Sequence, residues 1–130
     1  MNRRLWALRV AAELAGHSDR ELASLLPYFD EVLVPAGRRL ALQGRLANAY
    51  LIVLQGRLQA RSAGGAVRYL GAGDSFGWEA MWERGENPET VVVEADARLL
   101  LMGHAQFRAV KALADRPDQR SRIRAQTRVA

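Results

Sequence analysis

The residue types that could bind a phosphate are gathered in one stretch, FGWEAMWERGENPETVVVEA, which runs from Phe76 to Ala95. Gly77 stands near its start, and bare backbone amides at the start of a helical turn can point toward an anion. The same stretch contains five glutamates and only one arginine, Arg84. Whether such a loop can hold an anion therefore depends on what surrounds it.

Other chemistries find little support in the sequence. The chain has no cysteine, which excludes disulfides, thiolate catalysis, iron–sulfur clusters and cysteine-type zinc sites. His17 and His104 lie far apart, and no serine or threonine is visibly paired with either. Glu79 and Glu89 could in principle act as an acid–base pair, but charge crowding on a solvated loop explains them more simply. We expect no enzyme activity and no metal site.

Length and composition indicate one domain. A chain of 130 residues with 49% hydrophobic content can bury one core. No run of about 18 apolar residues is present, so we expect a cytoplasmic protein with no membrane partner. The net charge of +5 lies mostly in the last fifteen residues, which hold five arginines and one aspartate. That end could attract nucleic acid nonspecifically, but a solvated terminal helix is the simpler interpretation.

The elements that must position the loop are helices at both ends with strands between them. Ser18 and Glu21 have the spacing of a capping box at a helix start. From Glu31 the pattern alternates, with glycines at turns every seven to twelve residues, which predicts an antiparallel sandwich, barrel or roll. SAGGAV predicts a hairpin, and VVVEA and ARLLLM predict two further strands. The sequence HAQFRAVKALA predicts a helix with Phe107 and Val110 on one face. Pro117 predicts the start of a last helix.

Four segments, in order, carry a resemblance to a known family. PAGRRLALQG, AYLIVLQGRLQA, LGAGDSFG and EADARLLLMGHAQF resemble the cyclic-nucleotide-binding domain of the catabolite-activator and oxygen-regulator superfamily, over roughly Ser18 to Arg124. The resemblance implies an α+β fold: an antiparallel β-roll, similar to a double-stranded β-helix or jelly roll, flanked by N-terminal and C-terminal helices. We divide the single domain 1–130 into a helical N-terminal segment (1–30), a β-roll (31–103) with a phosphate-cassette-like loop (76–90), and C-terminal helices (104–130).

The resemblance also implies a ligand site. In the family, a glutamate of this loop binds the ribose and an arginine pairs with the cyclic phosphate; here Trp78 and Glu89 stand in their places. Cyclic AMP or cyclic GMP could bind by family resemblance, but Trp78 and Glu89 disfavour both. Arg84 could swing toward the ligand, or pair with Glu83 or Glu86 on the surface. The candidate ligand-binding residues are Phe76, Gly77, Trp78, Glu79, Ala80, Arg84, Glu89, Thr90 and Val91.

Two alternatives remain for the tryptophans of the loop. Trp78 and Trp82 are four residues apart, on one face of a helical turn, where they could cap an apolar pocket or stack on a base. They could instead fill the small core of the roll. The string GWEAM also resembles the branch of the superfamily whose oxygen-type regulators are not gated by cyclic nucleotides.

Two functions follow as hypotheses. The first is a non-catalytic regulatory module of signal transduction, in which a small molecule binds in the β-roll and acts on the C-terminal helices. The second is a degenerate domain that binds no cyclic nucleotide and serves as a protein-interaction or dimerisation scaffold. We expect the chain to form a homodimer through its C-terminal helices or to bind another protein. We expect no sequence-specific DNA binding, because the family's winged helix would follow Ala130.

Overall fold

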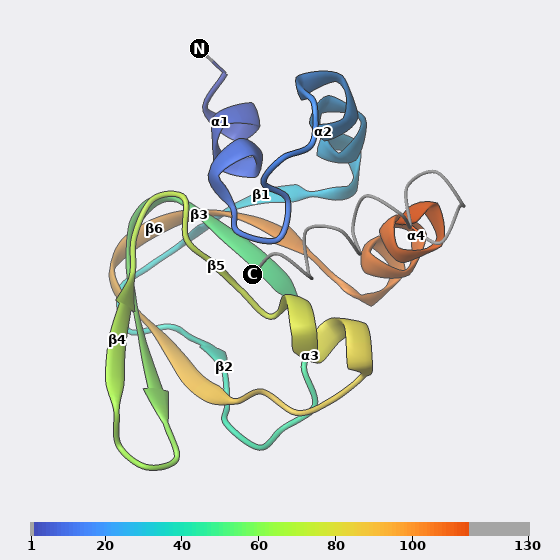
Figure 1. The fold of residues 1–130 in the computed structure, drawn as a ribbon. Coiled ribbons are helices and arrows are strands. Elements are labelled where there is room, and N and C mark those ends of the chain that lie inside the picture. Colours follow the sequence, from blue (N-terminus) through green and yellow to red (C-terminus); the bar gives the residue numbers. More distant parts are fainter. Residues whose placement is uncertain (1, 115–130) are drawn as a thin grey trace.

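The computed structural model describes residues 2–114 and shows an α+β fold (Figure 1). Two helices and a short 3-10 helix come first, six strands follow with a helix inserted before the last one, and a helix follows that strand. The elements are α1 (Arg3–Val10), α2 (Asp19–Leu25), η1 (Leu26–Tyr28), β1 (Asp30–Val34), β2 (Arg39–Ala41), β3 (Tyr50–Ser62), β4 (Val67–Leu70), β5 (Ser75–Phe76), α3 (Trp78–Glu83), β6 (Glu89–Met102) and α4 (His104–Ala114).

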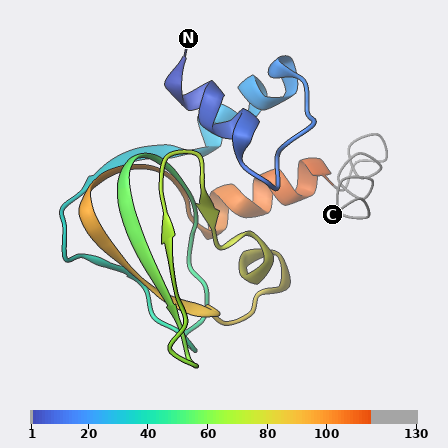
Figure 2. The same cartoon turned by 60° about the vertical axis from the view of Figure 1, so that its left-hand side comes forward.

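All strand pairs in the described residues are antiparallel. The main path of the sheet is β1-β6-β3-β4, while β2 pairs with β6 and β5 pairs with β3. The strands curl into a roll, and α1, α2 and α4 lie together on one side of it (Figure 2). The predicted antiparallel β-roll with flanking helices is confirmed. The predicted last helix after Pro117 lies outside the described residues.

One strand prediction is wrong. The sequence predicts two strands for VVVEA and ARLLLM, but both belong to the single 14-residue strand β6. Its pairing with β3 shifts register between Val53 and Leu58, around Gly56. Gly56 has φ +96°, and a Cβ there would lie 2.4 Å from the carbonyl oxygen of Asp96. The irregularity lets both strands bend without ending.

The apolar side chains of the described residues form two cores. One fills the roll and includes Leu58, Ala60, Leu70, Val91 and Val93. The other lies between the sheet and the helices, where Leu8, Leu22, Tyr50, Leu100 and Phe107 meet. Alternation along β3 assigns neighbouring residues to different cores, since successive side chains of a strand point to opposite faces.

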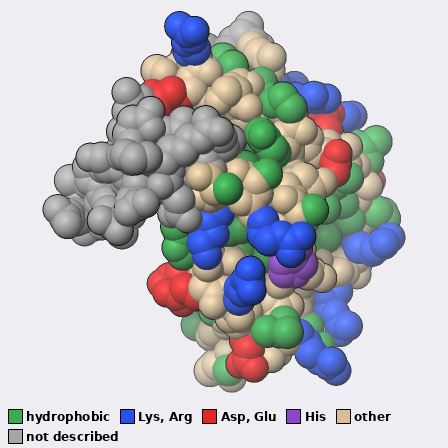
Figure 3. Space-filling view, turned by 90° about the vertical axis from the view of Figure 1, so that its right-hand side faces the viewer, with side chains coloured by type: hydrophobic (Ala, Val, Ile, Leu, Met, Phe, Trp, Pro, Cys, Tyr) green, Lys and Arg blue, Asp and Glu red, His purple; other side chains and the backbone are tan. Residues whose placement is uncertain are grey.

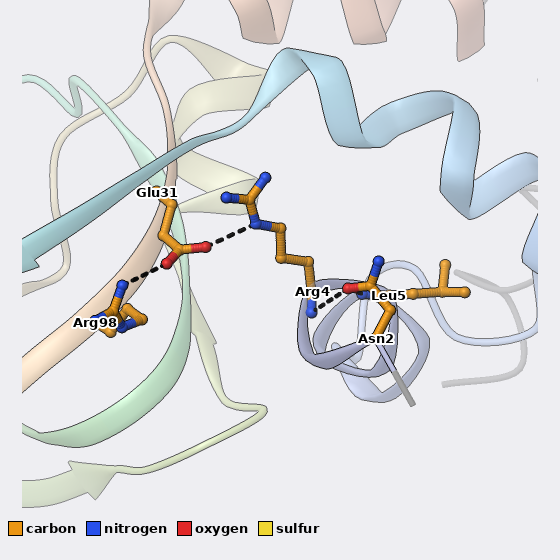
Figure 4. Close-up of polar contacts among 5 residues, drawn as sticks. All are labelled: Asn2, Arg4, Leu5, Glu31 and Arg98. Atoms are coloured by element: carbon orange, nitrogen blue, oxygen red, sulfur yellow. Dashed lines mark hydrogen bonds and ion pairs between the residues drawn. The ribbon is translucent and has the colours of Figure 1, made fainter.

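The N-terminal helices are fixed by caps and by one ion-pair cluster. The capping box is confirmed: Ser18 Oγ accepts from the Glu21 amide, and the Glu21 carboxylate accepts from the Ser18 amide. Glu31 of β1 accepts from Arg4 of α1 at 2.7 Å and from Arg98 of β6 at 2.6 Å (Figure 4). These contacts, with Arg98 first, lower the pKa of the Glu31 carboxyl. Glu31 therefore joins α1 to the roll.

Candidate functional site

The loop singled out from the sequence connects β5 to β6 and contains α3. Both ends of α3 have left-handed backbone: Gly77 has φ +102° and Arg84 has φ +56°. A Cβ at Gly77 would lie 2.3 Å from the carbonyl oxygen of Ala49. Glycine is therefore required at this position both by its φ angle and by the close approach of the neighbouring backbone.

Trp78 and Trp82 lie outside the core of the roll. Their rings stack on each other with centroids 5.8 Å apart, and each meets the Phe107 ring of α4 edge-on, at 5.2 and 6.3 Å. Trp78 also meets the Tyr50 ring edge-on at 5.1 Å. Both tryptophans pack against the core beneath the helices, so the expectation that they fill the core of the roll is wrong.

α4 makes a second, polar contact with the same helix. Lys111 Nζ donates to the main-chain carbonyl oxygen of Trp82 at 2.9 Å, and it lies 5.0 Å from the centroid of the Trp82 ring. The carbonyl is at the C-terminal end of α3, where a cation is electrostatically favourable. α3 is thus held to α4 by aromatic contacts and by a charged hydrogen bond.

The other residues predicted on α3 point elsewhere. Glu79 is exposed, and Ala80 packs at the edge of the core beneath the helices. Arg84 is exposed, and among residues 2–114 it has no ion pair with Glu83 or Glu86, contrary to one of our two expectations for it. Its positive φ places it in the turn that ends α3.

Glu89 has a partner that we did not expect from the sequence. Arg68 of β4 holds the Glu89 carboxylate with two nitrogens, Nη2 to Oε1 at 2.7 Å and Nε to Oε2 at 2.9 Å. The Glu89 side chain is 13% exposed and the Arg68 side chain 53% exposed. The hydrogen bond to Glu89 is the main cause of a raised Arg68 pKa. Such two-pronged pairs have both geometric specificity and charge assistance.

The register of the strands places this ion pair on the inner face of the roll. Ala60 of β3 is opposite Arg68 on one side and opposite Val91 on the other. Directly opposed residues point to the same face of a sheet, and Ala60 and Val91 are both fully buried in the core of the roll. Glu89 is two residues before Val91 and so shares its face.

Phe76 and Val91 are part of this inner face, whereas Thr90 is not. Phe76 and Val91 are buried in the core of the roll. Thr90 Oγ1 accepts a hydrogen bond from the Gln43 amide at 3.0 Å, which fastens β6 to the turn after β2. The nine predicted residues therefore do not gather in one place. Phe76, Glu89 and Val91 face the inside of the roll, Trp78 and Ala80 pack beneath the helices, and Glu79 and Arg84 are exposed. Gly77 and Thr90 instead hold the backbone at the two ends of the loop.

A partly buried polar contact beside the loop was not predicted from the sequence. The Tyr50 hydroxyl donates to Glu13 Oε1 at 2.8 Å, and Ser75 Oγ donates to the same oxygen at 2.7 Å. Burial, and then the Glu13 charge, raise the pKa of the Tyr50 hydroxyl well above its usual value. Glu13 follows α1, so this contact ties the N-terminal segment to β5, directly before Gly77. Sequence spacing carries no signal for it, because the three residues lie far apart in the chain.

The charged side chains of the described residues do not suggest a metal site. On the face shown in Figure 3, basic side chains gather around a histidine, while the acidic side chains lie farther from it. Within residues 2–114, no three histidine or acidic side chains are arranged to hold a metal ion. No helix over the same range is long and apolar enough to cross a membrane.

A β-roll whose loop helix packs on a following helix defines the class of cyclic-nucleotide-binding folds, and the comparisons agree with this. The family model "Cyclic nucleotide-binding domain" matches residues 31–112, so the chain belongs to this family. A comparison with curated proteins found no match.

Solved structures with the same fold come from varied proteins. The catabolite activator protein of Thermus thermophilus is 27% identical, with TM-score 0.70, over 91% of this chain and 56% of that one. The regulatory domain of Toxoplasma gondii PKA, crystallised with cAMP, is 22% identical, with TM-score 0.71, over 82% of this chain and 42% of that one. The N-terminal domain of a Streptomyces coelicolor transcriptional regulator is 20% identical, with TM-score 0.77, over 93% and 87%. The chain thus spans about half the length of the first two proteins.

Proposed function

We propose that the protein is a non-catalytic regulatory module, in which a small ligand in the β-roll changes the position of α3 and thereby of α4. The observation that carries this proposal is the contact of Trp78 and Trp82 with Phe107 and Lys111. α3 begins two residues after the inner-face residue Phe76, and its last turn contacts Lys111 of α4. A change at the roll would therefore reach α4 through one short helix.

The length and ends of α3 support this role. A helix of six residues is not stable by itself and takes its position from what it packs against. Its left-handed ends at Gly77 and Arg84 are places where the backbone direction changes sharply. Such short, separately packed elements can take two arrangements at small energetic difference.

The test measures α4 directly. Amide exchange of residues 104–112 is compared with and without millimolar cyclic AMP, cyclic GMP or a panel of uncharged metabolites, alongside the thermal unfolding midpoint. A ligand at about 100 times its dissociation constant stabilises the fold by about 2.7 kcal/mol. A ligand that raises the midpoint and also alters exchange in α4 supports the module. A ligand that raises the midpoint and leaves α4 exchange unchanged contradicts the coupling.

A second function is favoured by one specific observation. Arg68 is already paired with Glu89 on the inner face, which favours a degenerate domain that binds no cyclic nucleotide. Such a domain would serve as a scaffold for dimerisation or for another protein. No midpoint shift with any nucleotide or metabolite, together with a concentration-dependent mass in sedimentation, would favour this scaffold over the sensor.

A further inference from the structure

The ion pair on the inner face has two unequal members. Glu89 is the first residue of the long strand β6 and its side chain is 13% exposed, whereas Arg68 is on the four-residue strand β4 and its side chain is 53% exposed. Among the described strands, β4 pairs with β3 alone and forms the end of the sheet path. The arginine can therefore leave the contact and stay solvated, while the carboxylate stays where it is.

One further charge near the pair, Asp74, has the same sign as Glu89. Asp74 is the second carboxylate that acts on Arg68, and its Oδ2 accepts from the Gly71 amide at 2.8 Å, which fixes its position. Both carboxylates thus act on one guanidinium. An anion that bound Arg68 inside the roll would have to draw the guanidinium away from Glu89 and leave that mostly buried carboxylate without a cation, which is strongly unfavourable.

We propose that the Arg68–Glu89 pair determines the charge of the ligand that the roll accepts: it rejects anionic groups, cyclic phosphate included, and admits a ligand whose group at this place is uncharged or cationic. The inference rests on the proposed sensing function and specifies its ligand class. Glu89 is the fixed charge and Arg68 is the displaceable one. Neither residue needs to move for an uncharged ligand, and a cationic group would take the place of the Arg68 guanidinium.

The experiment reverses the pair. In the double variant R68E/E89R the two side chains keep opposite charges, so that the fold retains its ion pair, but the fixed charge of the inner face becomes positive. The matched control is R57E/E94R, which reverses another Arg–Glu pair, between the exposed side chains of β3 and β6. Cyclic AMP and adenosine are titrated calorimetrically into each protein at low ionic strength, where contacts with phosphate are least screened.

The expected result is specific to the phosphate. R68E/E89R binds cyclic AMP at least about tenfold more tightly than the wild type, equivalent to about 1.4 kcal/mol, while adenosine binding is unchanged. If R68E/E89R does not fold, E89Q takes its place, since it removes the competing carboxylate at nearly constant volume. A several-fold gain in cyclic AMP affinity over the wild type is then expected. The proposal is overturned if cyclic AMP binds the tested variant no more tightly than it binds R57E/E94R.

The same titration separates this inference from the proposed function. Tight cyclic AMP binding to R68E/E89R with unchanged amide exchange in α4 supports the charge assignment and contradicts the coupling. Wild-type protein that binds cyclic AMP much more tightly than adenosine overturns the charge assignment, even if α4 responds.

Discussion

Replacement of Phe107 by leucine tests whether α3 is held by α4. Phe107 is 2% exposed, and its ring meets Trp78 and Trp82 edge-on at 5.2 and 6.3 Å. Each such contact contributes about 0.5–1.5 kcal/mol beyond burial, so that F107L should lose about 1–3 kcal/mol. For a chain of this size the unfolding midpoint should fall by about 4–12 °C.

The stability loss alone does not test the coupling, so the assay is residue-resolved amide exchange. In F107L, exchange in α3 (residues 78–83) should accelerate more than exchange in β3 (residues 50–54). The control is V110A, which removes a buried aliphatic group from the same helix and lowers stability by about 1–3 kcal/mol without removing a ring. Equal acceleration of α3 in F107L and V110A would refute the reasoning.

Three further predictions concern the frame around the loop. Gly37→Ala should cost only the roughly 1–2 kcal/mol of left-handed backbone strain, because a Cβ at Gly37 meets no atom within 4 Å. Gly77→Ala should cost well more than that, because its Cβ would also meet the Ala49 carbonyl oxygen. Equal losses of unfolding free energy for the two variants in urea would contradict this. The pKa of Glu31 is lowered in the fold, so its contribution to stability is present above about pH 4.5 and is lost as the pH falls below that value. Glu31→Gln should therefore flatten the acid side of the curve of unfolding midpoint against pH. An unchanged curve would count against the ion-pair cluster in Figure 4. Tyr50→Phe removes a hydrogen bond to the Glu13 carboxylate and should cost about 1.5–3 kcal/mol in thermal unfolding, and a neutral result would mean that Glu13 is held by Ser75 alone.

Local signals in the sequence predicted most of the fold. The capping box at Ser18 is a contact between near neighbours, and the hairpin at SAGGAV depends on glycines whose backbone freedom is needed at the turn; Gly65 has φ +89°. Leu58 and Ala60, which alternate with polar residues in the sequence, are both buried in the core of the roll. Alternation could not show that β6 continues through its bend. Where the register shifts, the alternation of apolar and polar residues is interrupted, and such an interruption is also what the end of a strand produces.

The site was less accessible, because its contacts depend on tertiary packing. The stripe formed by Trp78 and Trp82 is visible in the sequence, but a stripe does not say which surface covers it, and Phe107 lies 25 residues after Trp82. The partner of Glu89 was in principle available. Once the SAGGAV turn fixes the hairpin, Arg68 falls opposite Ala60 and must point inward. That inward arginine is a signal in the sequence that our reasoning overlooked.

The two long strands have a consequence for how the molecule unfolds. β3 and β6 each supply side chains to the core of the roll and to the core beneath the helices, and they pair with each other through both. Neither core can lose its strands while the other keeps them. Melting of the helix-covered half should therefore withdraw support from the other half at the same moment, and heat should produce one cooperative transition rather than two. Because β3 and β6 bend near Gly56 without ending, they make the two hydrophobic clusters a single folding unit.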